Sequence, residues 1–227
     1  PAKNGLNNPV DRFLQPYFAK KEVKQRKLVD DRSFLRRIYL GLIGLPPPPE
    51  QYGAFAEDKD PGKYEKVADS LLANDEHYMQ HWISFWNDAF RNSYTRQYHG
   101  GNKYRLTNWL KASLKANKPY DQFVREQIAG DLLPNATQAQ RIATGFHRNT
   151  MVNEEGGIDP LEFRFYAMVD RVNTTATTWL GLTLGCAQCH THKFDPVPHR
   201  SYYEMMAFLN NAAEPELPVT TAAQQRE

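Results

Sequence analysis

The chain has 227 residues, of which 41% are hydrophobic and 24% charged, a composition that suits a soluble globular protein with a sizeable core. Its 28 lysines and arginines nearly balance its 26 aspartates and glutamates, and the formal net charge is +2. This balance argues against nucleic acid or an anionic membrane as the partner. No run approaches the roughly 20 apolar residues of a membrane span, and the first residues lack the hydrophobic segment of a secretory signal.

The first half of the chain predicts four helices. Residues 8–18 begin with an asparagine cap and a proline at the first helical position, although a second proline is expected to bend or break this helix. Residues 31–42 repeat the helical spacing, and the four prolines at 46–49 end that helix in a stiff corner. Residues 60–72 form the next helix, and residues 78–90 carry an aromatic stripe that is more typical of helix–helix core than of a cofactor pocket.

The second half continues with short helices at residues 106–114, 123–128 and 137–144. The longest helix is predicted from Asp159, its cap, through to Gly185, and a closing helix at 201–209 begins with a capping-box pattern. No segment alternates convincingly like a β-strand, and no internal repeat is present. The expected fold class is mainly α, an irregular multi-helix domain with long loops.

Residues 186–190 read CAQCH, the C-x-x-C-H spacing with which two thiols hold a haem covalently. Cys186 and Cys189 are the only cysteines of the chain. The histidine that follows the second cysteine lies beneath the porphyrin in this arrangement and becomes the proximal iron ligand. The sequence therefore predicts one covalent haem c, attached through Cys186 and Cys189 and ligated by His190, with the helices arranged around it.

Other interpretations of the motif stay open. Cys186, Cys189, His190 and His192 could form a compact zinc site, although zinc sites usually take their second pair of ligands from a separate segment. A redox dithiol normally lies in an alternating β/α pattern, which is absent here, and a disulfide across two residues would close a small, strained loop.

The sixth iron position decides between an electron carrier and a catalyst. His147 is the first candidate, because a second imidazole opposite His190 gives a six-coordinate, low-spin haem suited to electron transfer. Met151 is the next candidate, followed by His77, His81 and His99 or an open position. Residues 154–162 gather four carboxylates, of which Asp159 is explained as a helix cap, whereas Glu154 and Glu155 could pair with arginines or bind calcium.

Long motifs run through nearly the whole chain: residues 36–47 (RRIYLGLIGLPP), 119–123 (PYDQF), 129–134 (AGDLLP), 143–149 (ATGFHRN), 153–160 (NEEGGIDP), 169–174 (VDRVNT) and 186–196 (CAQCHTHKFDP). In this order they resemble a planctomycete-type cytochrome c domain family of unknown function. The resemblance implies that residues 1–227 are a single helical haem-binding domain, excised from a large exported protein with further domains on either side. One departure is Phe85-Trp86, where many relatives are expected to carry a histidine before the tryptophan.

We therefore expect a c-type cytochrome domain that exchanges electrons with an adjacent domain or a redox partner protein. Because haem is attached covalently outside the cytoplasm, the expected location is periplasmic or otherwise exported. The alternative is a haem-dependent oxidoreductase, a peroxidase or oxidase acting on a carbohydrate or small organic substrate, with His147 and Arg148 as distal groups. A second alternative is a zinc-stapled interaction domain without haem.

Overall fold

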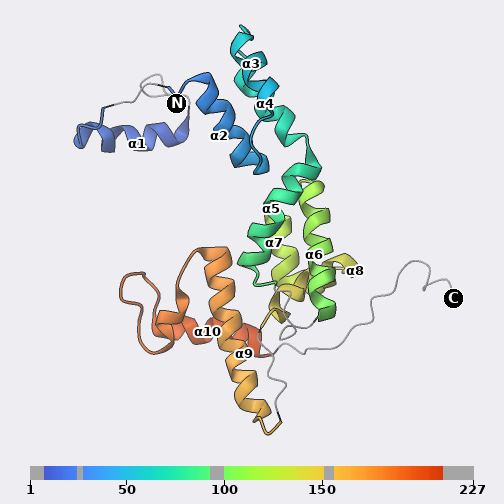
Figure 1. Cartoon of the computed structure of the whole chain (residues 1–227). Helices are drawn as coiled ribbons and strands as arrows, with labels where there is room; N and C mark the ends of the chain where they lie inside the picture. The colour runs from blue at the N-terminus through green and yellow to red at the C-terminus, as the bar shows by residue number, and fades with distance from the viewer. Residues whose placement is uncertain (1–7, 25–27, 93–99, 151–155, 212–227) are drawn as a thin grey trace, which may run out of the picture. The chain divides into compact units, whose positions relative to one another are not determined.

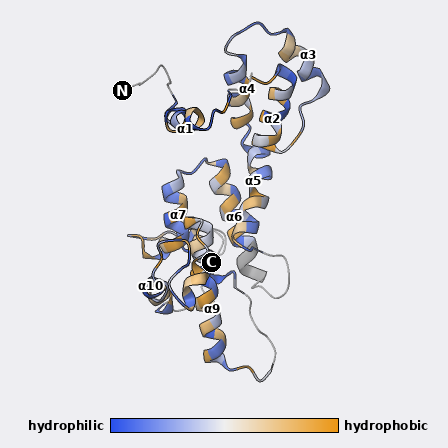
Figure 2. Cartoon of the chain, turned by 90° about the vertical axis from the view of Figure 1, so that its left-hand side faces the viewer, coloured by the Kyte–Doolittle hydropathy of each residue, from blue (hydrophilic) through white to orange (hydrophobic). Residues whose placement is uncertain are grey.

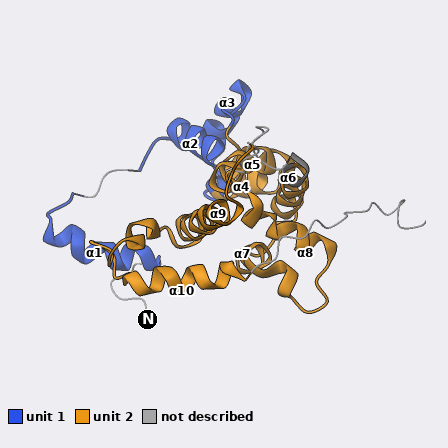
Figure 3. Cartoon of the chain, turned by 90° about the horizontal axis from the view of Figure 1, so that it is seen from below, with its two compact units in different colours: residues 1–41, 45–64 blue, residues 42–44, 65–227 orange. Residues whose placement is uncertain are grey.

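The computed structural model describes residues 8–24, 28–92, 100–150 and 156–211. This part of the chain is mainly helical and contains no β-strand, so the predicted fold class is confirmed (Figure 1). None of its helices is long and apolar enough to cross a membrane. Contacts between residues divide the chain into two compact units, Pro1–Gly41 with Leu45–Tyr64 and Leu42–Gly44 with Glu65–Glu227 (Figure 3).

Unit 1 contains α1 (Pro9–Lys20), α2 (Asp31–Ile43) except its last two residues, α3 (Pro49–Glu57) and the first two residues of α4 (Lys63–Leu72). The side chain of Asn8 caps α1 as predicted, because its Oδ1 accepts the amide of Val10 at 2.9 Å. Pro16 lies inside α1 without ending it, so the expected break is wrong; a proline removes one hydrogen bond, which the rest of the helix tolerates here.

The run of prolines at residues 46–49 also begins a helix. Pro49 is the first residue of α3, a helix that the sequence analysis missed, and at this position the absent amide hydrogen is not needed. The next helix, α4, begins at Lys63 rather than at Asp60. Asp60 instead starts a turn in which its carboxylate accepts the amide of Gly62 at 2.8 Å.

A buried lysine ties α2 to α4. Lys63 is 8% exposed, and its Nζ donates to Asp31 Oδ2 at 2.6 Å and to the carbonyl of Phe55 at 2.9 Å. The hydroxyl of Tyr64 donates to the other oxygen of Asp31 at 2.6 Å. Hydrogen bonds from Lys63 and Tyr64 lower the pKa of Asp31, so its carboxylate stays charged beside the lysine. The rings of Phe34, Phe55 and Tyr64 pack against one another beside this pair.

The larger unit has two hydrophobic clusters, and the first lies among α5 (Asp75–Ala89), α6 (Gly100–Lys115), α7 (Tyr120–Ala129), α8 (Gln138–Ala143) and two short 3₁₀ helices, η1 (Gly130–Leu132) and η2 (Thr144–Arg148). Its buried residues are Phe90, Leu106, Trp109, Leu110, Phe123, Ala143 and Phe146. Hydrophobic and hydrophilic residues follow one another along α6, as expected of a helix with one buried side (Figure 2). The predicted aromatic stripe on α5 is therefore only partly core. Trp86 packs against the first cluster, whereas Phe85 is 54% exposed.

The second cluster is built by α9 (Pro160–Thr175), a π-helical continuation η3 (Ala176–Leu180), the 3₁₀ helix η4 (Leu184–Gln188) and α10 (His199–Asn210). Asp159 caps α9 as predicted by accepting the amide of Leu161 at 2.8 Å. The prediction that this helix runs to Gly185 is wrong, because Gly181 adopts a left-handed conformation with φ of 65° and ends it. The capping box at Ser201 is also wrong, since α10 begins after Pro198 and Ser201 lies within its first turn.

Contacts from the α9 side hold the two clusters together. The indole of Trp179 stacks on Trp86 with ring centroids 6.0 Å apart and also contacts Phe90 and Phe146. Arg91, at the end of α5, donates to both carboxylate oxygens of Asp170 on α9 at 2.6 and 2.5 Å. These contacts fix the cluster that carries residues 186–190 to the rest of the unit.

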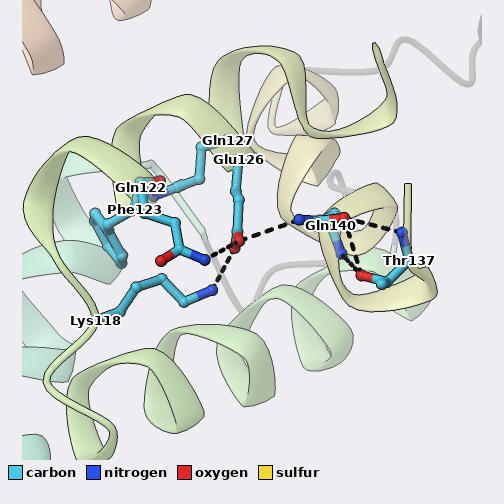
Figure 4. Close-up of polar contacts among 7 residues, drawn as sticks. All are labelled: Lys118, Gln122, Phe123, Glu126, Gln127, Thr137 and Gln140. Atoms are coloured by element: carbon cyan, nitrogen blue, oxygen red, sulfur yellow. Dashed lines mark hydrogen bonds and ion pairs between the residues drawn. The ribbon is translucent and has the colours of Figure 1, made fainter. Parts of the chain in front are cut away.

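A buried carboxylate joins α7 to α8 (Figure 4). Glu126 is only 2% exposed and forms an ion pair with Lys118. Gln122 and Gln140 donate to its other oxygen at 2.9 and 3.4 Å, and Gln140 completes a capping box with Thr137 at the start of α8. Burial raises the pKa of Glu126, but the hydrogen bonds from Lys118 and the two glutamines outweigh it, so the pKa is lowered overall.

Candidate functional site

The C-x-x-C-H segment is folded as the short 3₁₀ helix η4. Cys186 lies within this helix, and Cys189 is the residue that directly follows it. Both thiols are free and exposed. Two residues of the same helix, Leu184 and Ala187, are buried in the second cluster at 5% and 0% exposure. The core therefore anchors the segment and leaves both thiols exposed.

The exposed ring of His190 is oriented by a backbone carbonyl. Its Nδ1 lies 2.7 Å from the carbonyl oxygen of Thr191, which can only accept, so Nδ1 carries the ring proton. The neutral ring then has its lone pair on Nε2. A hydrogen bond of this kind, from one ring nitrogen to a carbonyl, is the usual way in which a protein orients a metal-binding histidine. In this tautomer Nε2 is the ring nitrogen of His190 that could bind a metal.

His192, two residues further on, has a different role. Its Nδ1 accepts the backbone amides of Phe194 at 3.2 Å and Asp195 at 2.8 Å, and its Nε2 lies 3.5 Å from the hydroxyl of Thr183. The side chain is buried, and the ring holds the turn that follows the motif. Because both nitrogens are engaged, His192 is not positioned as a ligand. Among the described residues no three His, Cys, Asp or Glu side chains form a metal-binding group, which leaves the compact zinc site without structural support.

His147 lies in η2. Its Nε2 is 3.1 Å from the carbonyl of Ile128 on α7, and its Nδ1 is buried without a hydrogen-bond partner. Burial lowers the pKa of His147, and the charge of Arg171 lowers it further, so the ring is neutral at neutral pH. Arg171 also donates to the backbone carbonyl of His147 at 2.7 Å. Within the described residues no hydrogen bond or ring contact joins His147 to His190.

The other candidates for the sixth iron position are dispersed. His77 accepts a hydrogen bond from Asn74 at the start of α5, and His81 packs edge-on against Trp82 and Phe85. Met151, Glu154, Glu155 and His99 lie outside the described residues. The structure therefore assembles the thiols and His190 at one place and does not bring a second histidine to them from α5.

The chain matches one known protein family over most of its length. A family model described as PSCyt2, a protein of unknown function (DUF1549), matches residues 9–214. The chain belongs to the PSCyt2 family. No curated protein and no solved structure matches it. The expected resemblance is thus confirmed as membership of this family of unknown function.

Apolar side chains stay exposed on both sides of the motif in this PSCyt2 chain. Leu180, six residues before Cys186, is 59% exposed, and Phe194, four residues after His190, is 83% exposed. Single exposed apolar side chains are common on protein surfaces, and they are compatible with a flat apolar ligand attached at the motif. A porphyrin held by two thioethers is such a ligand, so the residues around the motif fit a covalent haem.

Sequence reasoning missed two residues that contact the motif from the following helix. His199 and Tyr203 of α10 donate to the backbone carbonyls of Ala187 and Gln188. Nothing in their sequence pattern marks them, because the contacts depend on how α10 returns along the motif in the PSCyt2 fold. Gly185 lies close to α9, since a Cβ at this position would be 3.0 Å from the side-chain amide oxygen of Asn173.

Proposed function

We propose that this domain is a c-type cytochrome that holds one covalent haem through Cys186 and Cys189, with His190 as the proximal iron ligand. The observation that supports it best is the geometry of residues 186–190: two exposed thiols, followed by an imidazole whose Nδ1 is engaged by a backbone carbonyl. The family membership and the exposed apolar side chains beside the motif agree with it.

A haem bound here would supply an iron that alternates between the ferric and ferrous states and so carries one electron. The chain's own contribution is to anchor the ring at two thiols, to orient His190 through Thr191 and to keep both thiols exposed. Exposure favours electron exchange with another protein surface rather than with a substrate enclosed in a cavity. The proposed partner is therefore an adjacent domain or a separate redox protein, outside the cytoplasm where haem is attached covalently.

Expression in a host that attaches c-type haem tests this function. The wild-type chain is expected to keep one haem in mass analysis under denaturing conditions. Cys186→Ser with Cys189→Ser is expected to lose it entirely, because no other cysteine is present to form a thioether. His190→Ala is expected to reduce haem retention and to change the optical spectrum through loss of the proximal ligand. Zinc in place of haem, or haem that is extracted by acid and acetone, would refute the covalent cytochrome.

His147 is the proposed sixth ligand: its Nε2 donates to the carbonyl of Ile128, which leaves the lone pair on the unpartnered Nδ1, and ligation would require this buried nitrogen to reach the iron. The ferric wild type is then expected to be low-spin and slow to bind carbon monoxide once reduced, since an occupied position must first open. His147→Ala is expected to become high-spin and to bind carbon monoxide quickly while it keeps its haem. An unchanged spectrum together with reduced stability would instead assign the ring to its hydrogen bond with Ile128.

A further inference from the structure

Helix α10 contacts the backbone of the haem-binding segment through two side chains. Nδ1 of His199, in the first turn, lies 2.8 Å from the carbonyl oxygen of Ala187, and the hydroxyl of Tyr203 lies 2.9 Å from that of Gln188. These carbonyls belong to the two residues between the cysteines. Because a carbonyl only accepts, both side chains act as donors.

The two donors support each other on the helix surface. His199 and Tyr203 are four residues apart on α10, and their rings meet edge-on with centroids 5.0 Å apart. The backbone amide of His199 also faces the hydroxyl of Thr191 at 3.4 Å, and Thr191 is the residue whose carbonyl orients His190. The same turn of α10 therefore contacts both the segment between the thiols and the residue that sets the His190 ring.

The buried residues of the segment are fixed by packing. Ala187 is fully buried in the second cluster, where Tyr202 and Met206 of α10 pack with residues of α9. A 3₁₀ helix of five residues has weak internal hydrogen bonding and needs such outside support to keep one conformation. Without the donors from α10, the carbonyls of Ala187 and Gln188 would lose these partners and the segment would open more easily.

We propose that His199 and Tyr203 are positioning residues for haem attachment: together they clamp the segment between the cysteines so that both thiols and His190 reach one porphyrin. The role of His199 depends on Nδ1 as the donor, and that of Tyr203 depends on its hydroxyl. Neither residue is a ligand in this arrangement. The role in attachment rests on the proposed function, whereas the ordering of the segment does not.

Substitutions that remove one donor at a time test the clamp. Tyr203→Phe and His199→Ala are each expected to accelerate hydrogen exchange of the amides of residues 186–189 about fivefold, the effect of losing one hydrogen bond of about 1 kcal/mol. His199→Asn should restore slow exchange, because its amide nitrogen takes the place of Nδ1, whereas His199→Gln should not. Tyr166→Phe is the matched control, since it removes an exposed hydroxyl that donates to Glu162 within α9.

The same variants are then compared after expression in the host that attaches haem. Tyr203→Phe and His199→Ala are expected to lower the fraction of chains with both thioethers and to broaden the optical bands, while His199→Asn and Tyr166→Phe match the wild type. If no variant differs from Tyr166→Phe in exchange or in haem content, there is no clamp. A wild type without haem would refute the proposed function and the role in attachment, and the exchange rates would still show whether α10 orders the segment.

Discussion

Replacing Lys118 with methionine is expected to lower the free energy of unfolding of unit 2 by about 3 kcal/mol, because the substitution leaves a buried carboxylate without its cation. Glu126 is almost fully buried, and two glutamines alone would then face its charge. Lys118 also lies over the ring of Trp109, with Nζ 4.7 Å from the centroid, and this contact is lost as well. Urea denaturation followed by tryptophan fluorescence measures the change, since all four tryptophans lie in unit 2.

Lys115→Met provides the control for Lys118→Met. Lys115 pairs with Glu76 at 2.6 Å, but both side chains are more than 40% exposed, and an exposed pair of this kind contributes far less to stability than a buried one. Equal losses in the two variants would contradict the role of burial. Combining Lys118→Met with Glu126→Gln should cost less than the sum of the single changes, because the second change removes the unpaired charge.

The pH dependence of stability follows from the same carboxylate. The pKa of Glu126 is lowered on folding from its usual value of 4.5. Its charged form therefore stabilises the fold above that value, and the stabilisation is lost as the pH falls through the lower folded pKa. In Lys118→Met, burial is no longer outweighed by the lysine, so stability should begin to fall at a higher pH than in the wild type.

Gly130→Ala is the second substitution with a large expected effect, a loss of about 3 kcal/mol, at the upper end of the usual cost of overpacking a core. A Cβ at this position would lie 2.2 Å from the carbonyl oxygen of Gln140 and 3.0 Å from its carbonyl carbon. These are backbone atoms of α8, which cannot move aside as a flexible side chain would. The φ of Gly130 is −62°, so the cost is steric and not conformational.

The expected shift of the denaturation midpoint is measured with the same fluorescence signal. Gly156→Ala is the comparison, because no atom lies within 4 Å of its added Cβ and its φ is not in the left-handed region. It should change stability by less than about 0.5 kcal/mol. A similar small effect of Gly130→Ala would mean that η1 and α8 do not approach each other as closely as described.

Local signals in the sequence were sufficient for most helices. Asn8 and Asp159 begin helices as predicted, because a cap depends on one side chain and the two or three amides that follow it. The C-x-x-C-H spacing did not predict which residues of the segment are buried and which are exposed, because it specifies residue types and not their surroundings. The capping box expected at Ser201 was wrong because Pro198 already sets the start of α10.

The sequence by itself determined the helical class, the family and the set of two thiols and a histidine, since these depend on periodicity and on residues that are neighbours in the chain. Only the tertiary structure decided that His192 holds a turn, that His147 contacts Ile128 and that α10 donates to the C-x-x-C-H segment. The physical reason is that hydrogen-bond partners and burial arise between residues far apart in sequence, where no local pattern records which groups will meet.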